Sequence, residues 1–149
     1  MDESRHLGAA ERDLLITRAF LAPRERVLAA WLDPAQLAQW WGPKDCHAAI
    51  QEFEPEAGGP WRFVLHGPDG AGRPGECRFV EMDVPERIVF DHLSHPPFRA
   101  TVELETADGD TRLSLRLRFP DAAAREAARS LQADHEQAFD RLAALLAEG

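Results

Sequence analysis

The chain has 149 residues, of which 44% are hydrophobic and 29% charged, so it has the composition of an ordinary globular domain with room for one core. Its formal net charge of −9 argues against a nucleic-acid partner or an anionic membrane surface, because both bind clustered lysine and arginine. No apolar run approaches the roughly 20 residues that a spanning helix needs, so no membrane insertion is expected.

The ends of the chain and its thiols indicate where the domain lies and which compartment suits it. Residues 1–11 are polar and unpatterned, and they predict a flexible N-terminal tail ahead of a single domain, 12–149. Cys46 and Cys77 belong to no CxxC-type motif, and the start of the chain does not read as a signal peptide. Reduced thiols and a cytoplasmic location are therefore expected.

The first part of the domain combines one strand with two short helices. Residues 13–20 are rich in apolar and β-branched side chains and predict the first strand. A short helix then begins with Pro23 in its first turn. Asp33-Pro34 ends this helix and can cap a second one, 34–40, which Gly42-Pro43 stops.

Six further strands are predicted after the helices, at 46–54, 61–66, 75–82, 87–93, 98–106 and 111–119. Turn signals separate them, and the clearest are Gly67-Pro68-Asp69-Gly70 and Asp108-Gly109-Asp110. Successive hairpins in one antiparallel sheet are the simplest topology for such an order. Apolar and polar residues alternate along the strands, so one face is predicted to be buried and the other hydrated.

Residues 121–148 contain neither proline nor glycine and predict one long C-terminal helix. Pro120-Asp121 supplies a break and an N-cap before it. Its apolar residues recur at spacings of three and four, which places them on one helix face. Because the middle of the chain offers only strands to cover that face, the predicted fold class is α+β, with the sheet curved around the helix.

The space between sheet and helix is predicted to be a cavity for an apolar or aromatic small molecule, because aromatic side chains occur on inward faces from every part of the chain. His135 lies on the apolar helix face and is the first candidate for a polar group that orients a ligand or transfers a proton. A purely structural role in the core is the alternative for His135 and for Trp40 or Trp41. The candidate ligand-binding residues are Trp40, Trp61, Phe63, Phe79, Phe90, His92, Phe98, His135 and Phe139.

The sequence carries no motif of a common catalytic or cofactor site. It has no GxSxG elbow, P-loop, dinucleotide fingerprint or HExxH, and the spacing of its histidines and cysteines matches no recognised zinc pattern. Cys77 is expected to be a buried thiol rather than a nucleophile. No cofactor, no metal and no catalytic residue are therefore assigned.

Several segments resemble a known family. The segment from Pro23-Arg24-Glu25-Arg26-Val27 through Trp40-Trp41-Gly42-Pro43 looks like the short helix pair of small proteins similar to the C-terminal domain of the activator of heat-shock-protein-90 ATPase. Similar middle strands, turns and helix end follow in order over about residues 14–147. They are Gly58-Gly59-Pro60-Trp61-Arg62-Phe63, His66-Gly67-Pro68-Asp69-Gly70, Pro85-Glu86-Arg87-Ile88-Val89-Phe90 and His135-Glu136-Gln137-Ala138-Phe139-Asp140-Arg141-Leu142.

The resemblance implies a fold more specifically than a function. The family belongs to the START and birch-pollen-allergen superfamily, whose helix-grip fold wraps a seven-stranded antiparallel sheet around a C-terminal helix, carries two short helices between strands 1 and 2, and encloses a cavity. The superfamily includes lipid and hormone carriers, polyketide cyclases and chaperone-activating domains. The first hypothesis is therefore a non-catalytic binding protein with a hydrophobic small-molecule ligand.

Two alternatives stay open. One is an interaction module for the cytosolic chaperone, although this chain has no room for the additional N-terminal domain that the chaperone activator carries. The other is a cyclase- or hydrolase-like enzyme that uses His135 or His92 as acid or base. A homodimer through the sheet or the short helices is compatible with the sequence, which marks no interface.

Overall fold

The computed structural model describes residues 11–148, so the predicted tail, 1–11, lies outside the described residues except for Glu11. The predicted helix pair and seven strands are confirmed, with small shifts of their bounds. In chain order the elements are β1 (Asp13–Phe20), α2 (Arg24–Leu32), α3 (Pro34–Trp40), β2 (His47–Phe53), β3 (Pro60–His66), β4 (Gly72–Asp83), β5 (Arg87–His92), β6 (Phe98–Ala107), β7 (Asp110–Arg118), α4 (Ala122–Ala127) and α5 (Ser130–Ala147).

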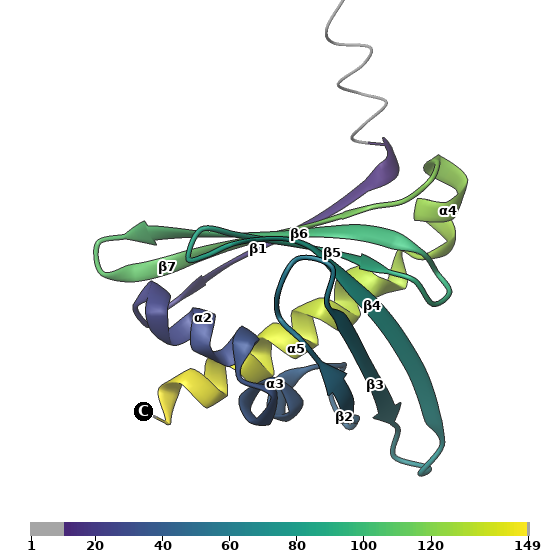
Figure 1. The fold of residues 1–149 in the computed structure, drawn as a ribbon, viewed down its shortest axis with the longest axis horizontal. Coiled ribbons are helices and arrows are strands. Elements are labelled where there is room, and N and C mark those ends of the chain that lie inside the picture. Colours follow the sequence, from purple (N-terminus) through teal and green to yellow (C-terminus); the bar gives the residue numbers. More distant parts are fainter. Residues whose placement is uncertain (1–10, 149) are drawn as a thin grey trace, which may run out of the picture.

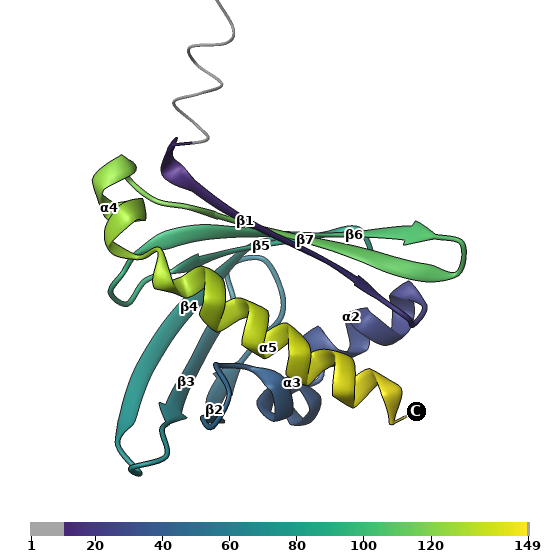
Figure 2. The same cartoon turned by 180° about the vertical axis from the view of Figure 1, so that it is seen from behind.

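The seven strands form one antiparallel sheet in the order β1-β7-β6-β5-β4-β3-β2. Strands β2 to β7 follow one another as hairpins, as predicted, whereas β1 pairs with β7 at the other edge. Helices α2 and α3 carry the chain between the two edges, and the sheet curves so that α5 runs along its concave face (Figures 1 and 2).

The predicted single helix over 121–148 is wrong in one respect, because the chain forms two helices separated around Ala128. Asp121 caps the first of them by accepting a hydrogen bond from the Ala124 N–H at 2.8 Å. At the junction the Leu131 N–H bonds to the Ala128 carbonyl, three residues back, at 2.9 Å. Such tighter bonding changes the direction of the chain, and α4 is visibly offset from α5 (Figure 2).

The core lies between the concave face and the helices, on the inward strand positions that alternation predicts. Leu113, Leu115 and Leu117 on β7 are no more than 1% exposed, and so are Phe139 and Leu142 on α5. Burying each such side chain contributes roughly 1.5–3 kcal/mol, which fixes the strand register and holds α5 on the sheet. Within residues 11–148, no helix combines the length and apolar character needed to cross a bilayer.

Candidate functional site

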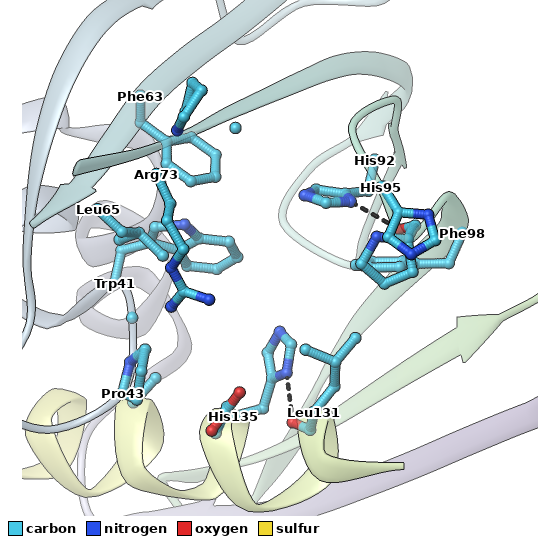
Figure 3. A pocket seen from close by; sticks show the side chains of 16 residues that line it. Trp41, Pro43, Phe63, Leu65, Arg73, His92, His95, Phe98, Leu131 and His135 are labelled. Atoms are coloured by element: carbon cyan, nitrogen blue, oxygen red, sulfur yellow. Dashed lines mark hydrogen bonds between the residues drawn. The ribbon is translucent and has the colours of Figure 1, made fainter. Parts of the chain in front are cut away.

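A pocket with a volume of about 180 Å³ lies at one end of the concave face, between the sheet and α5. In Figure 3, Trp41, Phe63 and Leu65 stand on one side of it, and His92 and Phe98 stand on the other. His135 and Leu131 rise from α5 below. The complete lining is Trp41, Gly42, Pro43, Phe63, Leu65, Arg73, Pro74, Gly75, His92, His95, Pro96, Phe98, Leu131, Asp134, His135 and Ala138.

The structure brings four of the nine candidate ligand-binding residues into this pocket: Phe63, His92, Phe98 and His135. The other five do not line it and are packed in the core with at most 3% exposure. They are Trp40, Trp61, Phe79, Phe90 and Phe139. These residues therefore lie on the buried face of the sheet and helix, as predicted, but neighbouring rings fill most of that face and the pocket lies at one end of it.

Trp41 takes the place expected of Trp40. Trp40 ends α3 and points into the core, where its indole N–H donates to the Ala30 carbonyl at 3.0 Å. Trp41 is the first residue after the helix, and its extended backbone turns the side chain toward Phe63 and His135, with ring centroids 5.9 and 6.0 Å away. The sequence signal for this residue was the Trp-Trp pair before Gly42-Pro43, which does not distinguish the two rings.

Gly75 allows the Phe63 ring to lie across β4. The two residues are register partners on β3 and β4, and a Cβ atom on Gly75 would lie only 2.3 Å from Cζ of Phe63. Any side chain at position 75 would therefore push the ring away from the strand. The open space beside the ring depends on this glycine.

Helix α5 also holds the loop that carries Trp41. The Arg141 guanidinium donates to the carbonyls of Gln39, Gly42 and Pro43 at 3.0, 3.1 and 3.2 Å. The Gln137 side-chain oxygen accepts from the Lys44 N–H at 3.1 Å. These bonds satisfy carbonyl groups at the C-terminal end of α3 and fix one wall of the pocket to its floor.

Replacing Arg141 by methionine is expected to lower the free energy of unfolding by about 1.5–3 kcal/mol, because it removes charged hydrogen bonds to three carbonyls while keeping an apolar stem. Urea unfolding would measure the loss. Arg129→Met is the matched control, since the Arg129 side chain is 75% exposed and, among residues 11–148, its ion pair is with Glu126 three residues earlier; its loss should stay below about 0.5 kcal/mol. Equal losses in the two variants would contradict the anchoring role.

The two pocket histidines are held in defined tautomers by backbone carbonyls. Nδ1 of His135 lies 2.8 Å from the Leu131 oxygen, and Nδ1 of His92 lies 2.9 Å from the Pro96 oxygen. A carbonyl only accepts, so each Nδ1 carries the hydrogen, and in the neutral ring Nε2 is left as an acceptor. The dashed lines in Figure 3 mark these bonds, and the other nitrogen of each labelled ring faces the pocket.

Both rings are neutral at neutral pH. Desolvation lowers the pKa of His92 below its ordinary 6.5 and outweighs the carbonyls of Pro96 and Ser94. Desolvation likewise lowers the pKa of His135, against the Leu131 carbonyl and the Asp134 carboxylate, and the proximity of His92 lowers it further. The site therefore presents two uncharged imidazoles among aromatic and aliphatic side chains.

Acidification is expected to destabilise the unmodified protein more than it destabilises a variant in which His92 and His135 are both replaced by glutamine. The unfolded chain binds protons with the ordinary pKa of 6.5, whereas the folded rings require a lower pH. Stability present above pH 6.5 is therefore lost as the pH falls through the window between 6.5 and the lowered pKa values. Urea unfolding at about pH 8 and about pH 5.5 measures this. The other ionisable groups lining the pocket, Arg73, His95 and Asp134, are present in both proteins, so equal acid losses would contradict the prediction.

Cys77 is the register partner of His92 but does not itself line the pocket. Cys77 is 1% exposed, as expected of a buried thiol, and burial raises the pKa of that thiol. Both cysteines are free. Across residues 11–148, no three His, Cys, Asp or Glu side chains are grouped so that they could hold a metal ion. The chemistry that the pocket offers is hydrogen bonding and ring contact, together with two imidazoles that can exchange protons.

Comparisons with known proteins agree on the fold. A solution structure of an Arthrobacter aurescens protein is 27% identical, has a TM-score of 0.88 and is matched over 95% of this chain and 89% of its own. A crystal structure from Rhodobacter sphaeroides is 28% identical with a TM-score of 0.85, over 93% and 94% of the two chains. The AHSA1 protein of Silicibacter pomeroyi shares the fold at 23% identity, with a TM-score of 0.77 over 91% and 97%. No curated protein matches the chain.

The family comparison covers most of the domain. The model of the family described as Activator of Hsp90 ATPase homolog 1-like protein matches residues 21–147, from the turn before α2 to the end of α5. This range includes every residue that lines the pocket. The chain therefore belongs to the family of Activator of Hsp90 ATPase homolog 1-like proteins, within the START/SRPBCC superfamily.

Proposed function

We propose that the protein binds a small, largely apolar molecule in the pocket between strands β3 to β6 and α5. The observation that carries the proposal is a pocket of about 180 Å³ beside the packed core, with aromatic walls and two imidazoles that backbone carbonyls hold in place. Pockets that combine apolar walls with a few convergent polar groups are typical ligand sites. Ligand contact is proposed for Phe63, His92, Phe98 and His135, together with Trp41.

The volume limits the size of the ligand. Pockets for drug-sized molecules have volumes of about 300–1,000 Å³, whereas an apolar cavity of about 150 Å³ is known to accept benzene. At about 180 Å³, this pocket suits a molecule with a single ring. A long lipid chain or a polycyclic molecule would require the walls to move.

Fluorine NMR with para-fluorotoluene and para-fluorophenol tests the proposal. Saturable binding is expected for at least one of these probes, and Leu131→Trp should abolish it, because Leu131 lines the pocket from a partly exposed position on α5 and a larger side chain there fills the space. Leu21→Trp is the matched control, since Leu21 is 89% exposed and lies outside the pocket. Absence of binding by both probes, or equal binding to Leu131→Trp, would contradict the proposal.

Family membership makes contact with a chaperone ATPase the second candidate function. Stimulation of the ATPase rate of the cytosolic chaperone by the purified protein would support it. The Leu131→Trp variant separates the two candidates, because filling the pocket should leave a function of the outer surface unchanged.

A further inference from the structure

The two pocket imidazoles offer hydrogen-bond acceptors to the same space. Each ring uses its Nδ1 hydrogen on a carbonyl of its own segment, so each Nε2 keeps a lone pair. Neither Nε2 has a partner among residues 11–148, and neither belongs to the buried unsatisfied atoms of that range. Both are thus accessible to a ligand, and they face it from different walls, the sheet and α5 (Figure 3).

Hydrogen-bond donors are scarce in the lining. Pro43, Pro74 and Pro96 contribute no backbone N–H. The free side-chain donors are the Trp41 indole, the His95 imidazole and the guanidinium of Arg73, and His95 and Arg73 are exposed residues. A molecule that displaces water from the Nε2 atoms without supplying a hydrogen leaves these acceptors unpaired, and such a loss weakens binding.

The ring walls of the pocket and the charged residues at its rim, Asp134 and Arg73, limit the class of molecule that can bind. Trp41 and Phe63 lie on one side, and the stacked pair of His92 and Phe98, with ring centroids 4.6 Å apart and 12° between the planes, lies on the other. These surfaces suit a flat ring. Asp134 and Arg73 give the rim opposite charges, so the rim favours neither a cation nor an anion over a neutral molecule.

We infer that the pocket selects neutral single-ring phenols, whose hydroxyl donates a hydrogen bond to Nε2 of His135 and whose ring lies between the walls that carry Trp41 and Phe98. A second hydroxyl on the same ring has His92 as its acceptor. This inference rests on the proposed binding function and specifies its ligand class. A hydroxyl fits better than an ether or a carbonyl, because of these three groups only the hydroxyl can donate a hydrogen bond to an Nε2 atom.

Matched probes test the inference. Para-fluorophenol and para-fluoroanisole differ only by the methyl group that replaces the hydroxyl hydrogen, and fluorine NMR gives the dissociation constant of each. The phenol is expected to bind at least about 10-fold more tightly than the ether. In His135→Phe this preference should fall below about 3-fold while ether binding persists, because an aromatic ring remains and the Nε2 acceptor is lost together with the Nδ1 bond to Leu131.

His47→Phe is the control, because His47 stacks on His66 away from the pocket and should leave the preference unchanged. The comparison of phenol and ether binding to the unmodified protein does not depend on whether any variant folds. Circular dichroism checks that the variants are folded. If the phenol and the ether bind the unmodified protein equally, the inference is overturned while the binding function stands. If no fluorinated ring binds at all, the inference and the proposed binding function are both contradicted.

Discussion

Replacing Trp40 by alanine is expected to lower the free energy of unfolding by about 4 kcal/mol. The side chain is fully buried and packs against the rings of Trp31, Trp41 and Phe139, with centroids 4.8, 5.7 and 6.2 Å away. Truncation would leave a cavity where α2, α3 and α5 meet, and the surrounding rings can fill it only in part. Because small domains are stabilised by about 5–15 kcal/mol in total, the variant should be folded only marginally.

The indole N–H contributes separately from the ring. It donates to the buried carbonyl of Ala30 at 3.0 Å, so Trp40→Phe, which keeps most of the ring but removes the donor, should cost about 1–3 kcal/mol. Leu21→Ala is the matched control for a large-to-small change, since Leu21 is 89% exposed, and its cost should lie within about 0.5 kcal/mol. Urea unfolding measures all three variants. A loss below about 1 kcal/mol for Trp40→Ala would contradict its placement in the core.

Most of the fold can be predicted from the sequence because its apolar residues follow two periodicities, that of a strand and that of a helix. Alternation along β7 places Leu113, Leu115 and Leu117 inward, and all three are buried. Helical spacing likewise places Phe139 and Leu142 on the buried face of α5. Both patterns depend on local backbone geometry, so they can be recognised without knowledge of the partner that covers each face.

The break between α4 and α5 could not be predicted from local sequence patterns. Ala128 and Arg129 are good helix formers, and neither proline nor glycine marks the break. Arg125 reaches from α4 to the backbone carbonyl of Asp13 on β1, at 3.2 Å. Tertiary contact of this kind orients α4 differently from α5, and local propensity contains no information about it.

The candidate site was predictable in kind but only partly in its members. Periodicity identifies inward residues, yet it cannot tell which of them meet another ring and which meet open space. Phe79 and Phe63 lie on inward positions of neighbouring strands, but Phe79 stacks on Trp61, with centroids 5.8 Å apart, while Phe63 borders the pocket. Arg73 and Asp134 reach the rim through the curvature of the sheet and the placement of α5, which are properties of the whole fold.

Helix α5 connects the stability of the core with the properties of the pocket. Phe139 is fully buried one helical turn after His135, which lines the pocket. The Arg141 side chain, still on the same helix, holds the loop that bears Trp41. Loosening this helix should therefore weaken ligand binding as well as stability, whereas a change confined to one wall can separate the two effects.

Replacing Gly75 by alanine is such a change, and it is expected to close the pocket. The added methyl group would lie 2.3 Å from Cζ of Phe63 and 2.5 Å from its Cε2, so the ring must move off β4. The space beside the ring is the pocket itself. Binding of para-fluorophenol and of para-fluorotoluene should both fall by at least about 10-fold, which corresponds to about 1.4 kcal/mol.

The same variant should lose only about 1–2 kcal/mol of stability, toward the lower end of the cost of overpacking, because the displaced ring has a cavity to occupy. Gly67→Ala is the matched control: Gly67 lies outside the pocket, and the nearest atom to its added methyl group would be Asp69 Oδ1 at 3.3 Å. Weaker binding of both probes distinguishes Gly75→Ala from His135→Phe, because the latter variant should lose only the preference for the hydroxyl group. Unchanged affinity in a folded Gly75→Ala protein would show that the Phe63 ring does not govern access, and the ligand would then have to be sought outside this pocket.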